Sequence, residues 1–439
     1  MKPLKLILVL MAILPVISCT KLEEKLNAQI PFEEAKRNAD IAALLKGCYD
    51  SYRGPYQDQT GVFSLADMSA DNAIGPTRGG DWDDNGVWRV LHTHTWNAEN
   101  QRIRENFNNL LQIVFNTTNI VVFDPPKDVA AEAKFLRAYA MFTVLDLYDQ
   151  VPVREPGENL LLPSKVLKGT DALTFIINDL NAIMPDLGDG PPYKANKWAA
   201  KALLMKCYLN KGVYANRLNP TFAQADMDQV IALGNEITNS GRFNLEANFF
   251  TNFAPNNSEV SKEILFANQN IPGGGAGNVR FHAHAGTHYN QQPSGWNGFT
   301  TIAEFYDKFE ATDQRRGAAY PGFTDRTGMR VGFLIGQQYD ENGVALTDRG
   351  GKPLVFTREV APIVTGDVET PGIRVVKYPI QLNDAGTDTR EQPDNDYVLL
   401  RFADVRLMLA EAHLRKGAAP AALLIVNELR ATRGASPLG

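Results

Sequence analysis

Apolar residues recur with the period of an α-helix over long stretches near both ends of the chain. In the first stretch they stand at i, i+3, i+4, i+7, i+8 and i+11, which places them on one stripe of a helix. A helix with such a stripe becomes stable when the stripe packs against a neighbouring element. The residues of this stripe are Ile41, Leu44, Leu45, Cys48, Tyr49 and Tyr52.

Four longer segments give the same helical signal. They are "AEAKFLRAYAMFTVLDLYDQVPV" (131–153), "NKWAAKALLMKCYLNKG" (196–212), "YVLLRFADVRLMLAEAHLRKG" (397–417) and "APAALLIVNELRATRG" (419–434). The second is apolar almost all round, so we expect other helices to enclose it. The pairs that start near residues 128 and 196 are similar to stacked tetratricopeptide repeats. We therefore predict a mainly α fold with a tetratricopeptide-like scaffold of helical pairs.

Residues 242–395 lose this helical period. Gly, Pro, Asn and Asp recur every few residues, and a helical signal survives only at "TTIAEFYDKFE". Two short runs, "KEILFA" and "IRVVKYP", favour β-strands weakly. We predict a loop-rich insert with minor β structure between helical parts at 32–241 and 396–439, all within one domain over 32–439. Loops on a rigid scaffold commonly carry binding residues.

The first eighteen residues have the composition of a secretory signal peptide. Lys2 and Lys5 precede an apolar run that is too short to span a bilayer. The following "VISC" resembles a bacterial lipobox, which implies cleavage before Cys19 and acylation of that residue. Several acyl chains anchor a protein to a membrane almost permanently. We predict a signal peptide at 1–18 and a lipidated tether at 19–31, whose charged start indicates transport to the cell surface.

Charge and missing motifs argue against several classes of protein. The net charge of −6 gives no basic surface for nucleic acid, so we predict no nucleic-acid partner. Cys48 and Cys207 lie in apolar helical segments, which favours buried thiols over a disulfide or a catalytic cysteine. The sequence holds neither a GxSxG motif nor a Gly-rich phosphate loop. We predict no cofactor and no catalytic residue.

Large aromatic residues gather in two polar segments. "GGDWDDNGVWRVLHTHTW" (79–96) holds three of the five tryptophans, and "NVRFHAHAGTHYNQQPSGWNGF" (278–299) holds a fourth. Indole rings normally lie in a core or an interface. We expect the segments to converge on one surface, where exposed rings form a flat shelf for sugars and polar side chains bind hydroxyl groups. The candidate ligand-binding residues are Trp82, Trp88, Trp296, Tyr289, Arg78, Asp81, Asn85, Asn290 and Gln291.

The same segments allow other interpretations. Each of these loop tryptophans could instead pack its loop against the helical body. We expect Trp198, which lies in a helical segment, to be part of the core. Five of the six histidines also fall here, and hydrogen bonding within the loops is the default interpretation for them. A metal site that activates water for hydrolysis is the alternative, although no HExxH motif or clear carboxylate partner accompanies them. These histidines are His92, His94, His282, His284 and His288.

The order of these segments resembles the SusD/RagB family of outer-membrane lipoproteins. A lipobox, "AEAKFLRAYAMFTVLDLYDQVPV", "NKWAAKALLMKCYLNKG", "FEATDQRR" and "DYVLLRFADVRLMLAEA" follow one another along the chain. One hallmark is carried by Ala133, Phe135, Leu136, Arg137, Ala138, Tyr148, Val151 and Pro152. The other is carried by Arg401, Ala403, Asp404, Leu407, Ala410, Glu411 and Ala412.

The resemblance implies a function that the spacing of residues does not give. It implies a non-catalytic lipoprotein at the cell exterior that binds a glycan. It also implies a SusC-like TonB-dependent transporter as the partner that takes up the captured oligosaccharide. A peptide-binding or purely structural component of such a complex is the alternative, and a metal-dependent hydrolase is a further one.

The chain departs from the family pattern in two places. Asp149 stands where the family usually has Gly, and Asp tolerates the same turn geometry. The sequence stops at Gly439, soon after "NELRATRG", where family members usually continue. We therefore expect the C-terminal part to be short for the family.

Overall fold

The computed structural model describes residues 32–271, 282, 284–382 and 395–439. Contacts divide the chain after Asp40 into two units. The described part of the first unit contains the short helix α2 (Phe32–Asn38). The predicted signal peptide 1–18, the lipidation residue Cys19 and the tether 19–31 lie outside the described residues.

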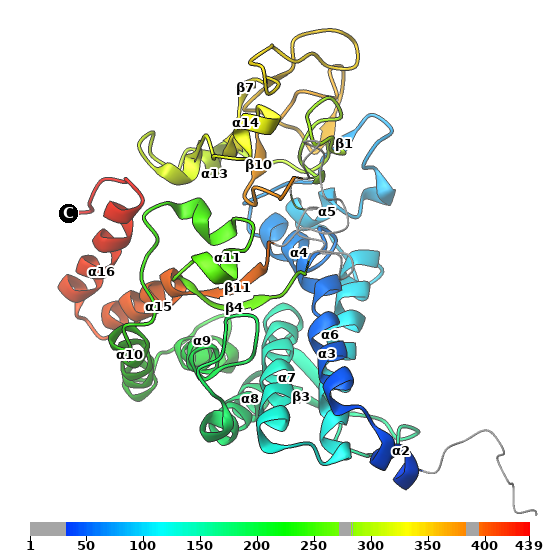
Figure 1. Cartoon of the computed structure of the whole chain (residues 1–439), viewed down its shortest axis with the longest axis vertical. Helices are drawn as coiled ribbons and strands as arrows, with labels where there is room; N and C mark the ends of the chain where they lie inside the picture. The colour runs from blue at the N-terminus through cyan, green and yellow to red at the C-terminus, as the bar shows by residue number, and fades with distance from the viewer. Residues whose placement is uncertain (1–31, 272–281, 283, 383–394) are drawn as a thin grey trace, which may run out of the picture. The chain divides into compact units, whose positions relative to one another are not determined.

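The second unit is built on long helices that pack against one another in chain order (Figure 1). They are α6 (Gln101–Ile120), α7 (Lys127–Tyr148), α8 (Gly169–Ile183), α9 (Lys197–Ala215), α10 (Gln224–Asn239), α15 (Phe402–Arg415) and α16 (Ala419–Thr432). Each of the first four contacts the next helix along the chain. After α10 the chain leaves the scaffold, and it returns as α15, which packs between α10 and α16. The prediction of a mainly helical fold is confirmed.

The apolar faces of these helices close a large core. Leu136 of α7 and Met205 of α9 are completely buried, and α9 is enclosed nearly all round as expected. Cys48 and Cys207 are buried free thiols, and Trp198 lies in the core, so these three predictions are confirmed. Burial raises the pKa of the Cys48 thiol to about 12. Within the described ranges, no helix is long and apolar enough to cross a membrane.

Side chains set the ends of the scaffold helices. The Asn100 side chain accepts hydrogen bonds from the first turn of α6, and Asn196 does the same for α9. Each cap satisfies backbone N–H groups that have no partner inside the helix. Asp149 ends α7 in the left-handed conformation, with φ 57°, and its N–H donates to the Leu145 carbonyl. An Asp is therefore able to take the place of the Gly that is usual there.

The start of the predicted helical segment 397–417 forms a strand instead of a helix. β11 (Tyr397–Arg401) pairs antiparallel with β4 (Ile264–Asn268), and α15 begins only at Phe402. The prediction of a helix over 397–401 is therefore wrong. Tyr, Val and Leu favour strands where a partner strand is available, and β4 supplies that partner from far along the chain.

The loop-rich insert contains several short strands. The weak β signals at "KEILFA" and "IRVVKYP" are confirmed by β4 and β10, while "TTIAEFYDKFE" gives only the single-turn helix α13 (Ala303–Tyr306). A separate group of buried apolar side chains, including Leu354 and Phe356, gives the insert a core of its own. Its strands are β5 (Gly317–Ala318), β6 (Val331–Leu334) and β10 (Arg374–Val376) in one sheet, β7 (Gly336–Gln337) with β8 (Val355–Phe356), and β9 (Ile363–Val364) with β1 (Thr77–Arg78).

A buried carboxylate ties the insert to both ends of the last helical pair. Glu263 lies directly before β4 with 0% of its surface exposed. It forms ion pairs with Arg401 at the end of β11 and, at 2.5 Å, with Arg433 just after α16. Burial alone would raise the pKa of Glu263, but the two guanidinium charges outweigh it and hold the pKa below its usual value. Three segments that are distant in sequence therefore meet on one side chain.

Replacing this carboxylate tests its role in stability. Glu263→Gln keeps the shape of the side chain but leaves two guanidinium groups without their counter-ion. Breaking a buried ion pair from one side costs about 3–5 kcal/mol, so we expect a clearly lower thermal midpoint. Asp307→Asn, which breaks an exposed pair with Arg358, should change the midpoint little.

The pH dependence of unfolding gives a second measurement. Because the folded-state pKa of Glu263 is lowered, its stabilisation is present above the unfolded pKa and disappears as the pH falls through the folded value. The wild type should therefore lose more stability than Glu263→Gln between pH about 5 and 3. Equal losses in the two proteins would contradict this role.

Candidate functional site

The two aromatic segments meet, but Trp88 lies inside the protein. Trp88 immediately precedes the short helix α5 (Arg89–His92), and only 2% of its surface is exposed. Its ring contacts Phe299 at 5.1 Å between centroids, and its Nε1 donates to Asp84 at 2.6 Å. The prediction that Trp88 offers its ring to a ligand is wrong, since the ring fills a small core beneath the loops. For this tryptophan the alternative, a plug that fixes the loop, is confirmed.

Trp82 and Trp296 form a partly exposed pair, here called the indole pair. Their ring centroids are 6.4 Å apart, and the indole Nε1 of Trp82 donates to the Trp296 carbonyl at 2.9 Å. Trp296 is 36% exposed, and Trp82 is half-buried. The two ring planes are inclined by 49°. The prediction of a flat shelf is therefore wrong, because the pair is an angled surface with one ring from each loop.

The backbone of Trp82 has an unusual conformation for a bulky residue. Its φ is 60°, in the left-handed region where a large side chain is rare and costs about 1 kcal/mol or more. Two hydrogen bonds between Arg78 and Asp81 close the turn just before it. The ring lies directly over Gly298, where an added Cβ would come within 2.1 Å of it. The loop thus holds the indole in a fixed place over Gly298, which has no side chain.

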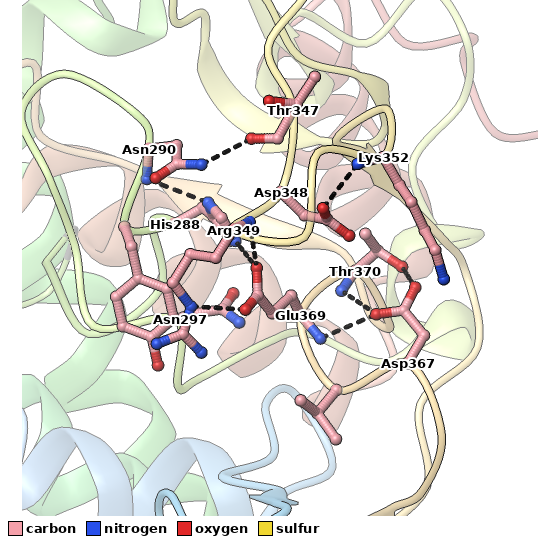
Figure 2. Close-up of polar contacts among 12 residues, drawn as sticks. His288, Asn290, Asn297, Thr347, Asp348, Arg349, Lys352, Asp367, Glu369 and Thr370 are labelled. Carbon is pink, nitrogen blue, oxygen red and sulfur yellow. Dashed lines mark hydrogen bonds and ion pairs between the residues drawn. The ribbon is translucent and has the colours of Figure 1, made fainter.

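A charged network supports the loop beside the indole pair (Figure 2). The Tyr289 hydroxyl donates to Asp81 at 3.1 Å, and the guanidinium of Arg349 lies 4.0 Å from the centre of the Tyr289 ring. Arg349 in turn pairs with Glu369 at 2.5 Å, and the same carboxylate contacts His288 Nε2 at 2.9 Å. Tyr289 and Asp81, both predicted to bind ligand, therefore hold the two loops together at the protein surface.

His288 is a neutral part of this network. It is completely buried, and burial outweighs the attraction of Glu369, so its pKa lies below the usual value. Its Nδ1 accepts the backbone N–H of Asn290, which leaves the proton on Nε2 to be donated to Glu369. Figure 2 shows these contacts converging on the Glu369 carboxylate.

Two of the predicted ligand-binding residues are buried instead. Arg78 donates to the carbonyls of Gly298, Val368 and Pro371, and Gln291 exchanges hydrogen bonds with the His288 backbone and the Gln338 side chain. Both are 2% exposed. The prediction that they contact ligand is wrong, because their polar groups are used within the protein. Burial lowers the pKa of Arg78 to about 10, which leaves it charged at neutral pH.

The two predicted asparagines lie at the surface. Asn85 is exposed in a turn with φ 55°, and Asn290 is exposed while its side-chain NH₂ group donates to the Thr347 carbonyl at 2.8 Å. Trp96 is 44% exposed and contacts His94, outside the contacts of the indole pair. Asn85 and Asn290 remain candidate ligand contacts.

The histidines have separate partners within the described residues. His92 pairs with Asp71, His94 contacts the Ser69 carbonyl, and His284 packs against the Trp296 ring. For His94 and His288 the default interpretation of loop hydrogen bonding is confirmed. No group of three His, Cys, Asp or Glu side chains within the described ranges is arranged to hold a metal ion.

Sequence reasoning missed several residues that shape this site. Gly298 and Phe299 support the Trp82 ring, while Arg349 and Glu369 hold Tyr289 from a third segment. Arg374 is completely buried and donates to the Asn297 side chain and to the carbonyls of Glu369, Pro371 and Gly372. Gly298 and Phe299 stand two and three residues after Trp296 in the quoted segment, which was an available signal. Arg374 lies in β10, whose β signal gave no hint of a role in the site, and Arg349 and Glu369 lie in loops without a pattern.

The fold and the site together define a scaffold of helical pairs that presents aromatic side chains on loops. Proteins of known sequence and structure show what the chain is similar to. The SusD family model matches residues 246–438, and over this part the chain resembles the SusD/RagB family. The short C-terminus that the sequence suggested is not tested by this match.

Two curated relatives match the chain at the same sequence identity. A SusD-like protein of Bacteroides ovatus is 26% identical over 315 residues, which are 70% of this chain and 52% of the relative. The starch-binding protein SusD of Bacteroides thetaiotaomicron is 26% identical over 330 residues, which are 68% of this chain and 57% of the relative. The matched part therefore spans little more than half the length of these relatives.

Solved structures agree on the fold. A SusD superfamily protein from Parabacteroides distasonis has a TM-score of 0.69 at 16% identity, covering 94% of this chain and 82% of that one. The surface glycan-binding protein A from Bacteroides thetaiotaomicron, in complex with laminarihexaose, has a TM-score of 0.65 at 14% identity, covering 91% and 84%. At these identities the matches establish the SusD-like fold.

The close contact beneath Trp82 gives a test of the geometry. Gly298→Ala places a methyl group in the space of the indole, so the ring must move outward and lose its hydrogen bond to Trp296. We expect the tryptophan fluorescence emission to shift to longer wavelength. Gly80→Ala is the matched control, because an added Cβ there meets nothing within 4 Å. An unchanged emission spectrum in Gly298→Ala would contradict the described packing.

Proposed function

We propose that this protein is a non-catalytic lipoprotein that captures a glycan at the cell surface. It passes the oligosaccharide to a SusC-like TonB-dependent transporter in the outer membrane. The observation that carries the proposal is the indole pair, in which two large rings from separate loops remain partly open to solvent at one place. Similarity to known proteins supports it, since the curated relative from Bacteroides thetaiotaomicron is named as a starch-binding protein.

The chemistry of the indole pair suits a sugar. The apolar C–H face of a pyranose ring stacks on an aromatic ring, while its hydroxyl groups need donors and acceptors at the edge. Asp81 and Asn290 supply such groups from the two loops beside Trp82 and Trp296. Because the ring planes are inclined by 49°, a bent or twisted chain can place successive sugars on both rings.

The buried supports make the surface ready for a ligand. Arg78 and Arg374 fix the backbone around Gly298, and Trp88 and Phe299 fill the space beneath Trp82. A surface that is already in its binding shape loses little conformational entropy when a ligand arrives. Aromatic and polar side chains on a rigid base are therefore suited to recognise a sugar, which combines an apolar C–H face with many hydroxyl groups.

Both rings of the indole pair can be truncated to alanine without changing a residue of the helical scaffold. Each stacking ring should contribute about 1 kcal/mol or more, so Trp82→Ala combined with Trp296→Ala should weaken glycan affinity by about 30-fold or more. The measurement is retardation in native gels that contain candidate polysaccharides, followed by titration calorimetry with the oligosaccharide of the best one. Trp296→Ala alone should give part of the loss.

Trp96→Ala is the matched control, since Trp96 is exposed but contacts neither ring of the pair. It should bind as the wild type does. The double variant should remain folded by circular dichroism, with a thermal midpoint lowered by the lost contacts of Trp82 with Phe299 and Trp88. Full glycan binding by the folded double variant, or binding of peptides alone by the wild type, would contradict the proposal.

The proposed location depends on Cys19. Cys19→Ser should remove the acylation site and release the exported protein from the membrane fraction, because acyl chains rather than a spanning helix are proposed to hold it. Cys207→Ser, at a buried thiol, should leave the protein in the membrane fraction. Fractionation with immunodetection measures both. Retention of Cys19→Ser in the membrane would contradict lipid anchoring at this residue.

A further inference from the structure

A second candidate site shares the Phe299 side chain with the packing of the indole pair. It is a cleft of about 400 Å³, here called the aromatic cleft. Rings from segments that are distant in sequence line it, and they include Phe63, His282, Phe299, Phe333, Tyr378 and Tyr397. The Phe299 ring also contacts Trp82, at 4.9 Å between centroids, so both surfaces share this side chain.

Within the described residues, Lys377 is the cation lining the aromatic cleft that forms no close ion pair, although the charge of Asp67 acts on it. Arg315 pairs with Asp313, and Arg401 shares the Glu263 carboxylate with Arg433. Lys377 also lines the cleft, its side chain is accessible to water, and its ammonium lies 4.6 Å from the centre of the Phe253 ring. Protein atoms nevertheless surround it, and burial lowers its pKa to about 8.

Polar groups suited to hydroxyls face the same space. Asp67 of α4 (Val62–Ser69) lines the cleft and accepts a hydrogen bond from Asn72, and the positive charge of Lys377 acts on its carboxylate. Thr300 is 3% exposed and lines the cleft, and its hydroxyl has no hydrogen-bond partner within the described part of the chain. A buried hydroxyl without a partner costs free energy that a ligand can recover. The cleft therefore offers unused polar atoms between aromatic rings.

We infer that the aromatic cleft binds a hexuronic acid, with the sugar carboxylate on the Lys377 ammonium and hydroxyls on Asp67 and Thr300. The aromatic rings would cover the apolar face of the pyranose. This site goes beyond the proposed function and takes from it only that the ligand is a sugar. It is separate from the indole pair, so a single chain or two different chains could occupy the two surfaces.

The charge balance favours an acidic sugar over a neutral one. A ligand that enters the cleft displaces water from the Lys377 ammonium, and a neutral ligand would leave that charge without a partner. A carboxylate replaces the lost water with a charge-assisted hydrogen bond, which is stronger where water is excluded. Because Arg401 and Arg433 share the single carboxylate of Glu263, this side of the cleft keeps a positive charge that also favours an acidic ligand.

Glucuronic acid and glucose give a matched pair of probes, since they differ only in a carboxylate in place of CH₂OH. Titration of the full chain with each sugar, followed by NMR or calorimetry, should show glucuronate binding at least about tenfold more tightly. Equal affinities, or no binding of glucuronate at millimolar concentration, would overturn the inference.

Two variants locate the binding. Lys377→Met keeps an apolar stem of similar length and should abolish the preference for glucuronate, whereas Lys165→Met, at an exposed lysine of β3 (Lys165–Lys168), should keep it. The double variant Trp82→Ala with Trp296→Ala should also keep it, so the outcome does not depend on the indole pair. A preference that survives in folded Lys377→Met would overturn the assignment.

The pH dependence distinguishes Lys377 from the other groups that face it. The charge of Arg401 from β11 lowers the pKa of Lys377, and the charge of Asp67 from α4 raises it. Burial raises the pKa values of Tyr378 and Tyr397. Burial lowers the pKa of His282 to about 4, so it stays neutral at higher pH. Glucuronate affinity should therefore be steady near pH 7 and fall above pH about 8 as Lys377 loses its proton. Affinity that is unchanged up to pH 10 would overturn the role of Lys377.

Discussion

The pairing of β4 with β11, held by Glu263, is the constraint on which the arrangement of the insert depends. The insert is a long excursion between α10 and α15, two helices that contact each other. Bringing the ends of a long chain segment together costs entropy that grows slowly with its length. A buried carboxylate shared by Arg401 and Arg433 offsets that cost at the point where the excursion closes. The loops of the insert then start and end at fixed positions on the scaffold.

The candidate site is assembled from loops by buried guanidinium groups that bind carbonyl oxygens. Arg78 and Arg374 both donate to Pro371, and between them they reach Val368, Glu369, Gly372, Asn297 and Gly298. Each carbonyl belongs to backbone that has no regular partner strand, so the arginines supply hydrogen bonds that a sheet would otherwise supply. This arrangement keeps irregular backbone rigid, while Trp82 and Trp296 stay partly exposed.

The helical scaffold was predictable from the sequence, whereas the site was predictable only in part. Apolar periodicity and helix caps are local signals, and they predicted α7 and α9 correctly. The concentration of tryptophans predicted that the two loops meet, as the Trp82–Trp296 contact bears out. Burial of Trp88 depends on distant Phe299, and the strand at 397–401 depends on distant β4, so neither had a local signal. Arginine is a residue type that often contacts ligands. Only the hydrogen bonds of Arg78 to backbone carbonyls show that it supports the loops instead.

The position of Phe299 between the indole pair and the aromatic cleft has a thermodynamic consequence. The ring contacts Trp82 and also forms part of the wall of the aromatic cleft. Densely packed side chains do not shift alone, so a ligand that displaces Phe299 from either side also changes the position of the opposite surface. Linkage makes such an effect reciprocal, because each ligand must alter the affinity of the other by the same factor. The binding of an acidic sugar in the cleft and of another sugar on the indole pair would then be coupled through the Phe299 ring.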